Sequence, residues 1–494
     1  MKVFLKKHAE LFVLAVLSVP LFFIGVGNTH DWGDDYAQYI TEALNIASGR
    51  PFYESTYIYN PLNPEYAPPN YPPGFPLLLA PVVALFGTGI QPLLYLISVI
   101  VVALLFTLYA YFKNHMSSRA ALCLAVVAVY SGVVMDLKSH VLSDLPLLFF
   151  VSLYFLFREK KQTHVNNTVL TLSLVMALLI RSQAVILLLA ELIYLFILLI
   201  RFRKEKSLRT VLFSETRLPA LLAAPLLYAL VHFFIFPAPA NAGTFYKNLF
   251  FLFNEHTWVL IGYNVNYLLD LLRRMLHFEM QDFFWQSLVS LLEYVCLVSV
   301  FLGFILSVRK KLGAGAIFFI LMCLLIVFLP VHQGHRYFLP VLPLYFLYLV
   351  RGARVALLPV LNLKGFSAAL VFTVLYLILG IDHFGRVSNF DNRGVYTYYD
   401  SLALKAIQEN IPSGDVIVFS KPRALALYTG KTAVNIAWQR SSAENRKLFD
   451  SLNVKYLLAR KGLEDEYIHD FLKKENYAKD TLEINPLYTL FTVR

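Results

Sequence analysis

The segment Gln91–Phe112, QPLLYLISVIVVALLFTLYAYF, decides the fold class, because its 22 residues include no charged side chain. An α-helix of about 20 apolar residues crosses the roughly 30 Å hydrocarbon core of a membrane. Leu11–Gly27 and Ser287–Val308 are similar stretches. The whole chain of 494 residues is 58% hydrophobic and 15% charged, against about 25% charged residues in soluble domains. These values exclude a soluble globular, collagen-like or disordered chain.

Apolar runs on both sides of this segment predict about eleven transmembrane helices. They cover residues 11–27, 91–112, 120–135, 143–157, 168–180, 183–200, 219–236, 286–307, 314–330, 337–350 and 366–381. If the basic N-terminus is cytoplasmic, the inside connections hold most Lys and Arg, whereas the short outside connections hold Lys138, Arg181 and Arg336. This pattern follows the positive-inside rule. The net charge of +11 is therefore interpreted as a topology signal and not as a nucleic-acid surface. A cleaved signal peptide ending near 25–27 is the alternative for the first span.

Neither cysteines nor histidines predict a metal or cofactor. Cys123, Cys296 and Cys323 all lie in apolar segments, where a buried thiol is expected. His332 and His335 have no convincing third ligand nearby in sequence. We expect no cofactor, and the sequence leaves a metal requirement open.

Three regions on the predicted outside are long enough to carry function: about 28–75, 237–285 and 383–494. The second mixes aromatic and basic residues, which fits either a belt at the membrane interface or a flap over a substrate. In the third, helices at 401–410, 423–428, 442–452 and 464–474 alternate with strands at 415–420, 431–437 and 454–459. The sequence thus predicts a transmembrane domain, 1–382, and a small soluble α/β extracytoplasmic domain, 383–494.

The first outer region, extended to 28–90, is expected to hold two helices at the membrane interface. Residues 34–49, DDYAQYITEALNIASG, have apolar side chains on one helical face and Asp34 and Asp35 at the N-terminus, where the helix dipole favours negative charge. A helix of about 15 residues fits along the membrane surface better than across it. Leu77–Phe86 is too short to span and predicts a second interfacial or re-entrant helix.

These residues resemble a known family. The acidic pair after the first span, a Tyr a few residues later, the small-residue and Gly end, and the Pro-rich entry Tyr71–Pro76 are similar to the first external loop of lipid-donor glycosyltransferases of the GT-C fold. The closest similarity is to the group of dolichyl-phosphate-mannose protein mannosyltransferases and the bacterial aminoarabinose transferase. Leu142–Pro146, Arg181–Ala184 and His335–Pro340 match that group in the same order.

The resemblance implies that Asp34, or its neighbour Asp35, is the general base that deprotonates an acceptor hydroxyl. Asp35 can instead cap the helix and raise the pKa of Asp34. The alternative is that both residues are only helix caps. The aminoarabinose transferase has a Lys-Pro pair where this chain has Tyr71-Pro72, so phosphate binding must fall to other residues.

The remaining site residues lie at the predicted outer ends of the membrane spans. Arg181 and Arg336 are the candidates for holding a lipid phosphate, and Tyr337 and Tyr71 are counted with the substrate-binding residues. The resemblance implies that Asp144 contacts a sugar hydroxyl or orients the base. A simple helix start, with Pro146 two residues later, explains Asp144 equally well.

We interpret the chain as a GT-C type polytopic membrane glycosyltransferase. It would move a hexose or pentose from a polyprenyl-phosphate donor to a hydroxyl of a lipid, glycan or protein acceptor outside a bacterial inner membrane. A transporter or flippase of lipid-linked substrates is the main alternative, although the sequence has no internal repeat of the kind that many transporters show. A non-catalytic scaffold, the third possibility, would make the acidic pair dispensable.

Overall fold

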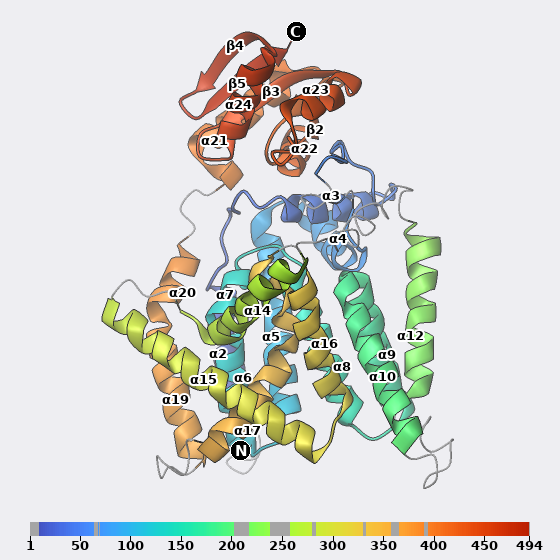
Figure 1. The fold of residues 1–494 in the computed structure, drawn as a ribbon, viewed down its shortest axis with the longest axis vertical. Coiled ribbons are helices and arrows are strands. Elements are labelled where there is room, and N and C mark those ends of the chain that lie inside the picture. The colour runs from blue at the N-terminus through green and yellow to red at the C-terminus, as the bar shows by residue number, and fades with distance from the viewer. Residues whose placement is uncertain are drawn as a thin grey trace. The chain divides into compact units, whose positions relative to one another are not determined.

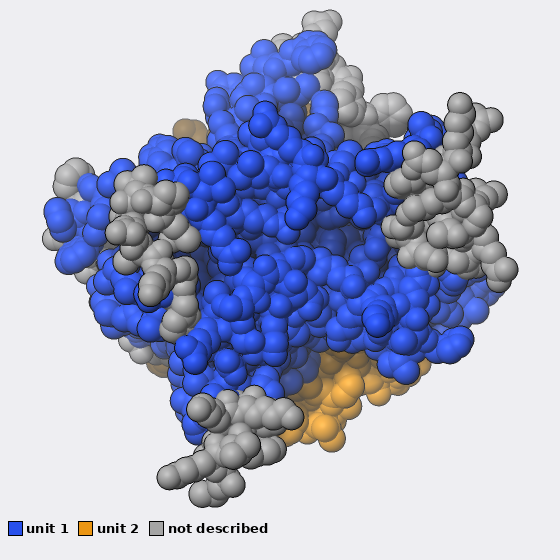
Figure 2. All heavy atoms as spheres, turned by 90° about the horizontal axis from the view of Figure 1, so that it is seen from below, with its two compact units in different colours: residues 1–26, 94–235, 254–389 blue, residues 27–93, 236–253, 390–494 orange. Residues whose placement is uncertain are grey.

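The computed structural model describes residues 9–63, 68, 70–201, 217–237, 257–278, 283–329, 332–356, 365–389 and 394–493. Two compact units divide the chain (Figure 2). The helical unit comprises residues 1–26, 94–235 and 254–389, and the α/β unit comprises residues 27–93, 236–253 and 390–494. The lysines at the N-terminus and the basic residues at 203–209, which contribute to the predicted charge alternation, lie outside the described residues.

Each of the eleven apolar segments predicted from the sequence overlaps at least one helix along the chain (Figure 1). The helices, mostly of the helical unit, are α2 (Ala9–Ser18), η1 (Val19–Phe22), α5 (Ile90–Lys113), α6 (Ser118–Val129), α7 (Gly132–Lys138), α8 (Asp144–Glu159), α9 (His164–Ile180), η2 (Ser182–Ala184), α10 (Val185–Arg201), α12 (Leu218–Leu230), η4 (Val231–Ile235), α14 (Thr257–Arg273), η5 (Arg274–Leu276), α15 (Phe283–Lys310), α16 (Ala314–Phe328), η6 (Gly334–Tyr337), η7 (Leu339–Val341), α17 (Leu342–Ala356), α19 (Gly365–Leu379) and α20 (Ile381–Ser388).

The predicted count of eleven spans is not confirmed. Among the described residues, five helices are long and apolar enough to cross a membrane, or up to seven if each of two bent helix pairs is one span. The bent pairs are α6 with α7 and α19 with α20, at angles of 53° and 44°. Other predicted spans fall on shorter helices, such as α9 with 17 residues and α16 with 15. The chain is thus a multi-pass membrane protein with several short helices.

Both bends lie where the chain segment after η5 approaches the break. A Cβ atom on Gly132, the first residue of α7, would lie 2.0 Å from the His277 carbonyl oxygen. A Cβ atom on Gly380, between α19 and α20, would lie 2.7 Å from the Phe278 ring. A side chain at Gly132 would therefore displace backbone and one at Gly380 would displace a ring, and the apolar runs bend at these two positions.

Helices α15 and α17 cross at small residues. A Cβ atom on Gly303 would lie 1.9 Å from the Tyr348 carbonyl oxygen, and one on Gly352 would lie 1.8 Å from that of Ser299. Small residues at a crossing allow two helix backbones to approach closely, which is a common way to pack helices in a membrane.

The α/β unit contains α3 (Asp35–Ala47) and α4 (Gly74–Phe86), at the positions predicted for the two interfacial helices. Its C-terminal part alternates helices and strands as predicted (Figure 1): η8 (Gly394–Tyr396), α21 (Tyr398–Asn410), β1 (Val416–Val418), α22 (Pro422–Thr429), β2 (Thr432–Val434), α23 (Ser442–Ser451), β3 (Val454–Arg460), α24 (Asp465–Glu475), β4 (Ala478–Asn485) and β5 (Tyr488–Val493). The strand order is β2-β1-β3-β5-β4. β1 is parallel to β2 and β3, whereas β5 is antiparallel to β3 and β4. The β4–β5 hairpin was not predicted from the sequence.

The first outer region joins this sheet beside β2. Tyr57 forms a parallel bridge with Ala433, and the backbone N–H of Ile58 donates to the Ala433 carbonyl at 2.8 Å. The Asn60 side chain also donates to the Asn435 carbonyl at 2.8 Å. The segment 56–60 is therefore fastened to β2, so residues near α3 and residues of α22 can form one site.

Candidate functional site

Asp34 immediately precedes α3, and its carboxylate binds the beginning of another helix. Its Oδ1 accepts hydrogen bonds from the backbone N–H groups of Arg423 and Ala424, each at 3.1 Å. These amides belong to the first turn of α22, where helix N–H groups lack a partner within the helix. The side chain is 8% exposed. Burial raises the pKa of Asp34 to about 6, although the positive charge of Arg423 opposes this rise. Asp34 thus caps α22 and not α3.

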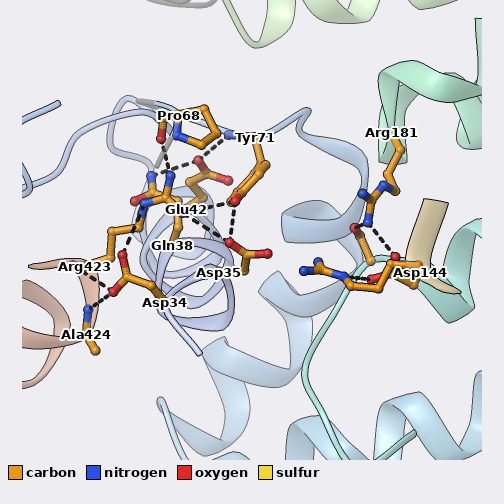
Figure 3. A network of polar contacts seen from close by, with 12 residues as sticks. Asp34, Asp35, Gln38, Glu42, Pro68, Tyr71, Asp144, Arg181, Arg423 and Ala424 are labelled. Atoms are coloured by element: carbon orange, nitrogen blue, oxygen red, sulfur yellow. Dashed lines mark hydrogen bonds and ion pairs between the residues drawn. The ribbon is translucent and has the colours of Figure 1, made fainter. Parts of the chain in front are cut away.

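Asp35, the first residue of α3, binds Tyr71 and Arg423 (Figure 3). The Tyr71 hydroxyl donates to Asp35 Oδ1 at 2.6 Å. Arg423 Nη1 lies 3.5 Å from the same carboxylate oxygen and donates to the Tyr71 hydroxyl at 3.1 Å. The Asp35 side chain is 26% exposed, compared with 1% for Arg423. The predicted residues Asp34, Asp35 and Tyr71 therefore lie together, around an arginine to which the sequence analysis gave no role.

Glu42, two turns along α3, supports this cluster. Its Oε1 accepts from the Tyr71 backbone N–H and from the Gln38 side chain, both at 2.9 Å. Its Oε2 is buried and has no hydrogen-bond partner among the described residues. Burial raises the pKa of Glu42 from 4.5 to about 8, so its neutral form is favoured at neutral pH. Glu42 was also missed, although residues 35, 38 and 42 recur at the spacing of one helical face.

Asp144, the first residue of α8, lies between two arginines in the helical unit. Arg181 Nη1 donates to Asp144 Oδ1 at 2.7 Å, and Arg336 Nε donates to Oδ2 at 3.1 Å. The guanidinium of Arg181 also lies over the Tyr337 ring, 5.0 Å from its centroid. All four predicted substrate-binding residues of this unit are therefore in one cluster.

Two positive side chains meet one negative side chain in this cluster. Asp144 is fully buried, whereas the side chains of Arg181 and Arg336 are 13% and 22% exposed. Guanidinium groups form strong, charge-assisted hydrogen bonds with phosphate oxygens. Such a cluster can hold a phosphate group, and Asp144 fixes the directions of the two arginines.

Of the two neighbouring histidines, His332 has a polar and an aromatic partner. His332 Nε2 lies 2.7 Å from the Asn264 side-chain oxygen, and its ring stacks on Tyr267. Burial lowers the pKa of His335 to about 4. In the described part of the chain, no group of three or more His, Cys, Asp or Glu side chains is placed to hold a metal ion.

The second outer region has exposed aromatic side chains, as either a membrane belt or a flap would have. Trp258, Tyr263 and Trp285 are 80%, 68% and 45% exposed. Tyr246, Glu279 and Asp282 of this region lie outside the described residues. The belt and the flap both stay predictions for this region.

Comparisons with known proteins support the resemblance. Residues 70–228 match the model of a family described as dolichyl-phosphate-mannose-protein mannosyltransferase. No curated protein sequence matches the chain. The structure of ArnT from Cupriavidus metallidurans bound to undecaprenyl phosphate is similar with a TM-score of 0.58 and 12% identity, over 98% of both chains.

A second similar structure is the archaeal oligosaccharyltransferase AglB from Archaeoglobus fulgidus, in complex with an inhibitory peptide and a dolichol-phosphate. Its TM-score is 0.58 at 15% identity, over 96% of this chain and 73% of AglB. The resemblance to lipid-donor glycosyltransferases of the GT-C fold is thereby confirmed. The comparisons support a membrane glycosyltransferase and bring no support for the transporter alternative.

Proposed function

We propose that the chain transfers a hexose or pentose from a polyprenyl-phosphate donor to the hydroxyl of an acceptor on the extracytoplasmic side of a membrane. The acceptor would be a lipid, a glycan or a protein. The family match over residues 70–228 and the ligands bound to ArnT and AglB support the reaction class and the donor class. We also propose the domain division 1–382 and 383–494 for this enzyme.

The environment of Asp34 carries the catalytic part of this proposal. In the reaction the sugar's anomeric carbon loses a phosphate, which leaves readily, while the acceptor hydroxyl must lose its proton. The transition state has oxocarbenium character. A general base works best when its pKa lies near the operating pH. The pKa of Asp34, raised to about 6, meets this requirement while keeping most of the carboxylate ionised at pH 7.

The cluster around Asp144 supports the part of the proposal that concerns binding of the polyprenyl-phosphate donor. We assign Arg181 and Arg336 to the lipid phosphate, where their charge stabilises the leaving group as the glycosidic bond breaks. Tyr337 lies beneath the Arg181 guanidinium and would restrict its motion. Asp144 would keep both guanidinium groups oriented. We assign Tyr71 a role beside the acid pair, because its hydroxyl donates a hydrogen bond to Asp35.

Replacement of Asp34 by asparagine tests the proposed base. The amide oxygen of the new side chain can still accept from the α22 backbone, so the protein should fold and bind lipid normally. Without a base, transfer should fall about 10²–10⁴-fold. The first measurement is mass spectrometry of envelope glycolipids and glycoproteins from cells with the wild-type gene, the variant or no gene. The second is the rate of transfer by purified protein from the donor so identified.

Asp480→Asn is the matched control, because Asp480 is exposed on β4. It should transfer at the wild-type rate. Wild-type transfer by Asp34→Asn would exclude Asp34 as the base, and identical envelope sugars with and without the gene would contradict the proposed function.

A further inference from the structure

We propose that α22, in the C-terminal part of the chain, completes the catalytic site and that Arg423 is a positioning residue for the carboxylates Asp34 and Asp35. This inference rests on the proposed function, because it assigns a task to residues around the proposed base. None of the resemblances stated above gives α22 or Arg423 a role.

The backbone of α22 fixes one carboxylate oxygen of Asp34. Pro422 is the first residue of the helix and has no N–H, so the next two amides are the first donors that the helix offers. Both donate to Asp34 Oδ1. With two donors on one oxygen, the carboxylate has a defined orientation, and Oδ2, which is buried and has no hydrogen-bond partner among the described residues, is the oxygen left to accept a proton.

The Arg423 side chain reaches further into the cluster, where its two terminal nitrogens and its guanidinium plane have partners. Nη2 donates to the Pro68 carbonyl, and Nη1 contacts the Tyr71 hydroxyl and Asp35 Oδ1. The guanidinium lies over the rings of Tyr57 and Tyr71, 5.2 Å and 5.0 Å from their centroids. Its Nε is 3.9 Å from Asp34 Oδ2. One buried positive charge therefore faces both carboxylates of the pair.

This charge favours the ionised form of the buried Asp34. Burial alone disfavours the carboxylate form, and a guanidinium at this distance favours it. The groups that face Asp34 are Arg423 of α22, Lys421 just before that helix, Asp35 on α3, and the hydroxyls of Tyr36 and Tyr57. Glu42 faces Arg423 from within α3. Arg423 acts most strongly among the charged groups that lower the pKa of Asp34.

The test is the pH profile of transfer for the wild type, Arg423→Gln and Arg423→Lys, with the donor identified as above. Since the base must be deprotonated, kcat falls at low pH along a limb set by the pKa of Asp34. Loss of the positive charge should raise that pKa, so the acidic limb of Arg423→Gln should move up by about 1–3 pH units. Arg423→Lys keeps the charge and should restore part of the shift. An unchanged limb in Arg423→Gln would overturn the inference.

Arg460→Gln is the matched control for lost stability. Arg460 also forms an ion pair with a buried carboxylate in the same unit, with its Nε 2.6 Å from Asp400 Oδ1. Arg460→Gln should yield less folded protein, but the acidic limb of its pH profile should stay where it is in the wild type. If Arg460→Gln moves the limb as far as Arg423→Gln does, the shift reports general loosening and the inference fails.

A measurement without substrate separates this inference from the proposed function. Melting temperatures are measured against pH for each protein and for its Asp34→Asn counterpart. The difference between the two temperatures reports the titration of Asp34. The pH at the midpoint of this titration should be higher in Arg423→Gln than in the wild type. This shift would support the placement of Arg423 even if the wild type transferred no sugar, and an unchanged midpoint would refute it.

Discussion

Residue Glu42 shows how burial and hydrogen bonding decide the charge of a side chain at this site. Two donors converge on its Oε1 while Oε2 is enclosed without a partner in the described structure. Both donors would also bind the carbonyl oxygen of a protonated carboxyl group. The neutral form thus holds the Tyr71 backbone as well as the ionised form would, without the cost of a buried charge.

Glu42 should make the fold less stable at alkaline pH. Its pKa is higher in the folded protein, about 8, than in the unfolded chain, about 4.3. Its stabilising contribution is therefore complete below the unfolded pKa and is lost as the pH rises through about 8. We expect the melting temperature of the wild type to fall between pH 6 and pH 9.

Glu42→Gln should flatten this part of the pH dependence, because glutamine keeps the accepting oxygen and cannot ionise. The measurement is thermal unfolding in detergent at each pH, with Glu54→Gln, an exposed residue of the same region, as the control. An equally steep fall in Glu42→Gln would show that another group is responsible.

At the scale of elements, the crossing of α15 and α17 should tolerate no side chain at Gly303. An alanine Cβ would lie on the Tyr348 carbonyl, so the helices must separate. Overpacking lowers the free energy of unfolding by about 1–3 kcal/mol where a core can adjust. Because the obstacle here is backbone, Gly303→Ala should lower it by about 3 kcal/mol or more. The check is the folded fraction and melting temperature of the purified variant.

Gly262→Ala in α14 is the counterpart, because its Cβ would meet no described atom within 4 Å. It should be neutral or slightly stabilising, since Ala favours helix more than Gly does. Equal melting temperatures for the two variants would show that α15 and α17 are not held at this crossing.

Element positions could largely be predicted from the sequence, because apolar runs and amphipathic spacing are local. The same patterns could not give the lengths or bends of the helices. The run 120–135 is apolar except for Ser131, yet its helix breaks before Gly132, where the carbonyl of His277, far along the chain, approaches. The β4–β5 hairpin was missed since much of β4 is exposed, so its sequence has no clear apolar signal.

At the scale of the whole molecule, the candidate site could be predicted only where each cluster contains a locally distinctive residue. Asp34 and Asp35 stand out as an acidic pair at a helix start, and Arg181 stands out between two apolar runs. Arg423 does not, because an arginine in a soluble helix is ordinary. Its importance comes from a contact with Asp34 across 389 residues of sequence, which depends on how segment 56–60 joins β2.

The compact α/β unit makes a sharp prediction about membrane topology. Residues 27–93 and 390–494 belong to one unit, so both must lie on the same side of the membrane, and an even number of crossings must separate them. The positive-inside rule predicts that this side is extracytoplasmic.

Cysteines introduced one at a time at Glu54 and Asp480, both exposed, should therefore react with a membrane-impermeant maleimide added to intact spheroplasts. A cysteine at exposed Lys161, between α8 and α9, should react only after lysis. Cys123 and Cys296 are buried and Cys323 is half-buried, and the unsubstituted protein gives the background. If Lys161→Cys reacted in intact cells and the other two did not, the orientation would be reversed and the acid pair would face the cytoplasm. If Glu54→Cys and Asp480→Cys reacted from opposite sides, the two halves of the unit could not share a site, and both Arg423 and β2 would lose the partners assigned to them.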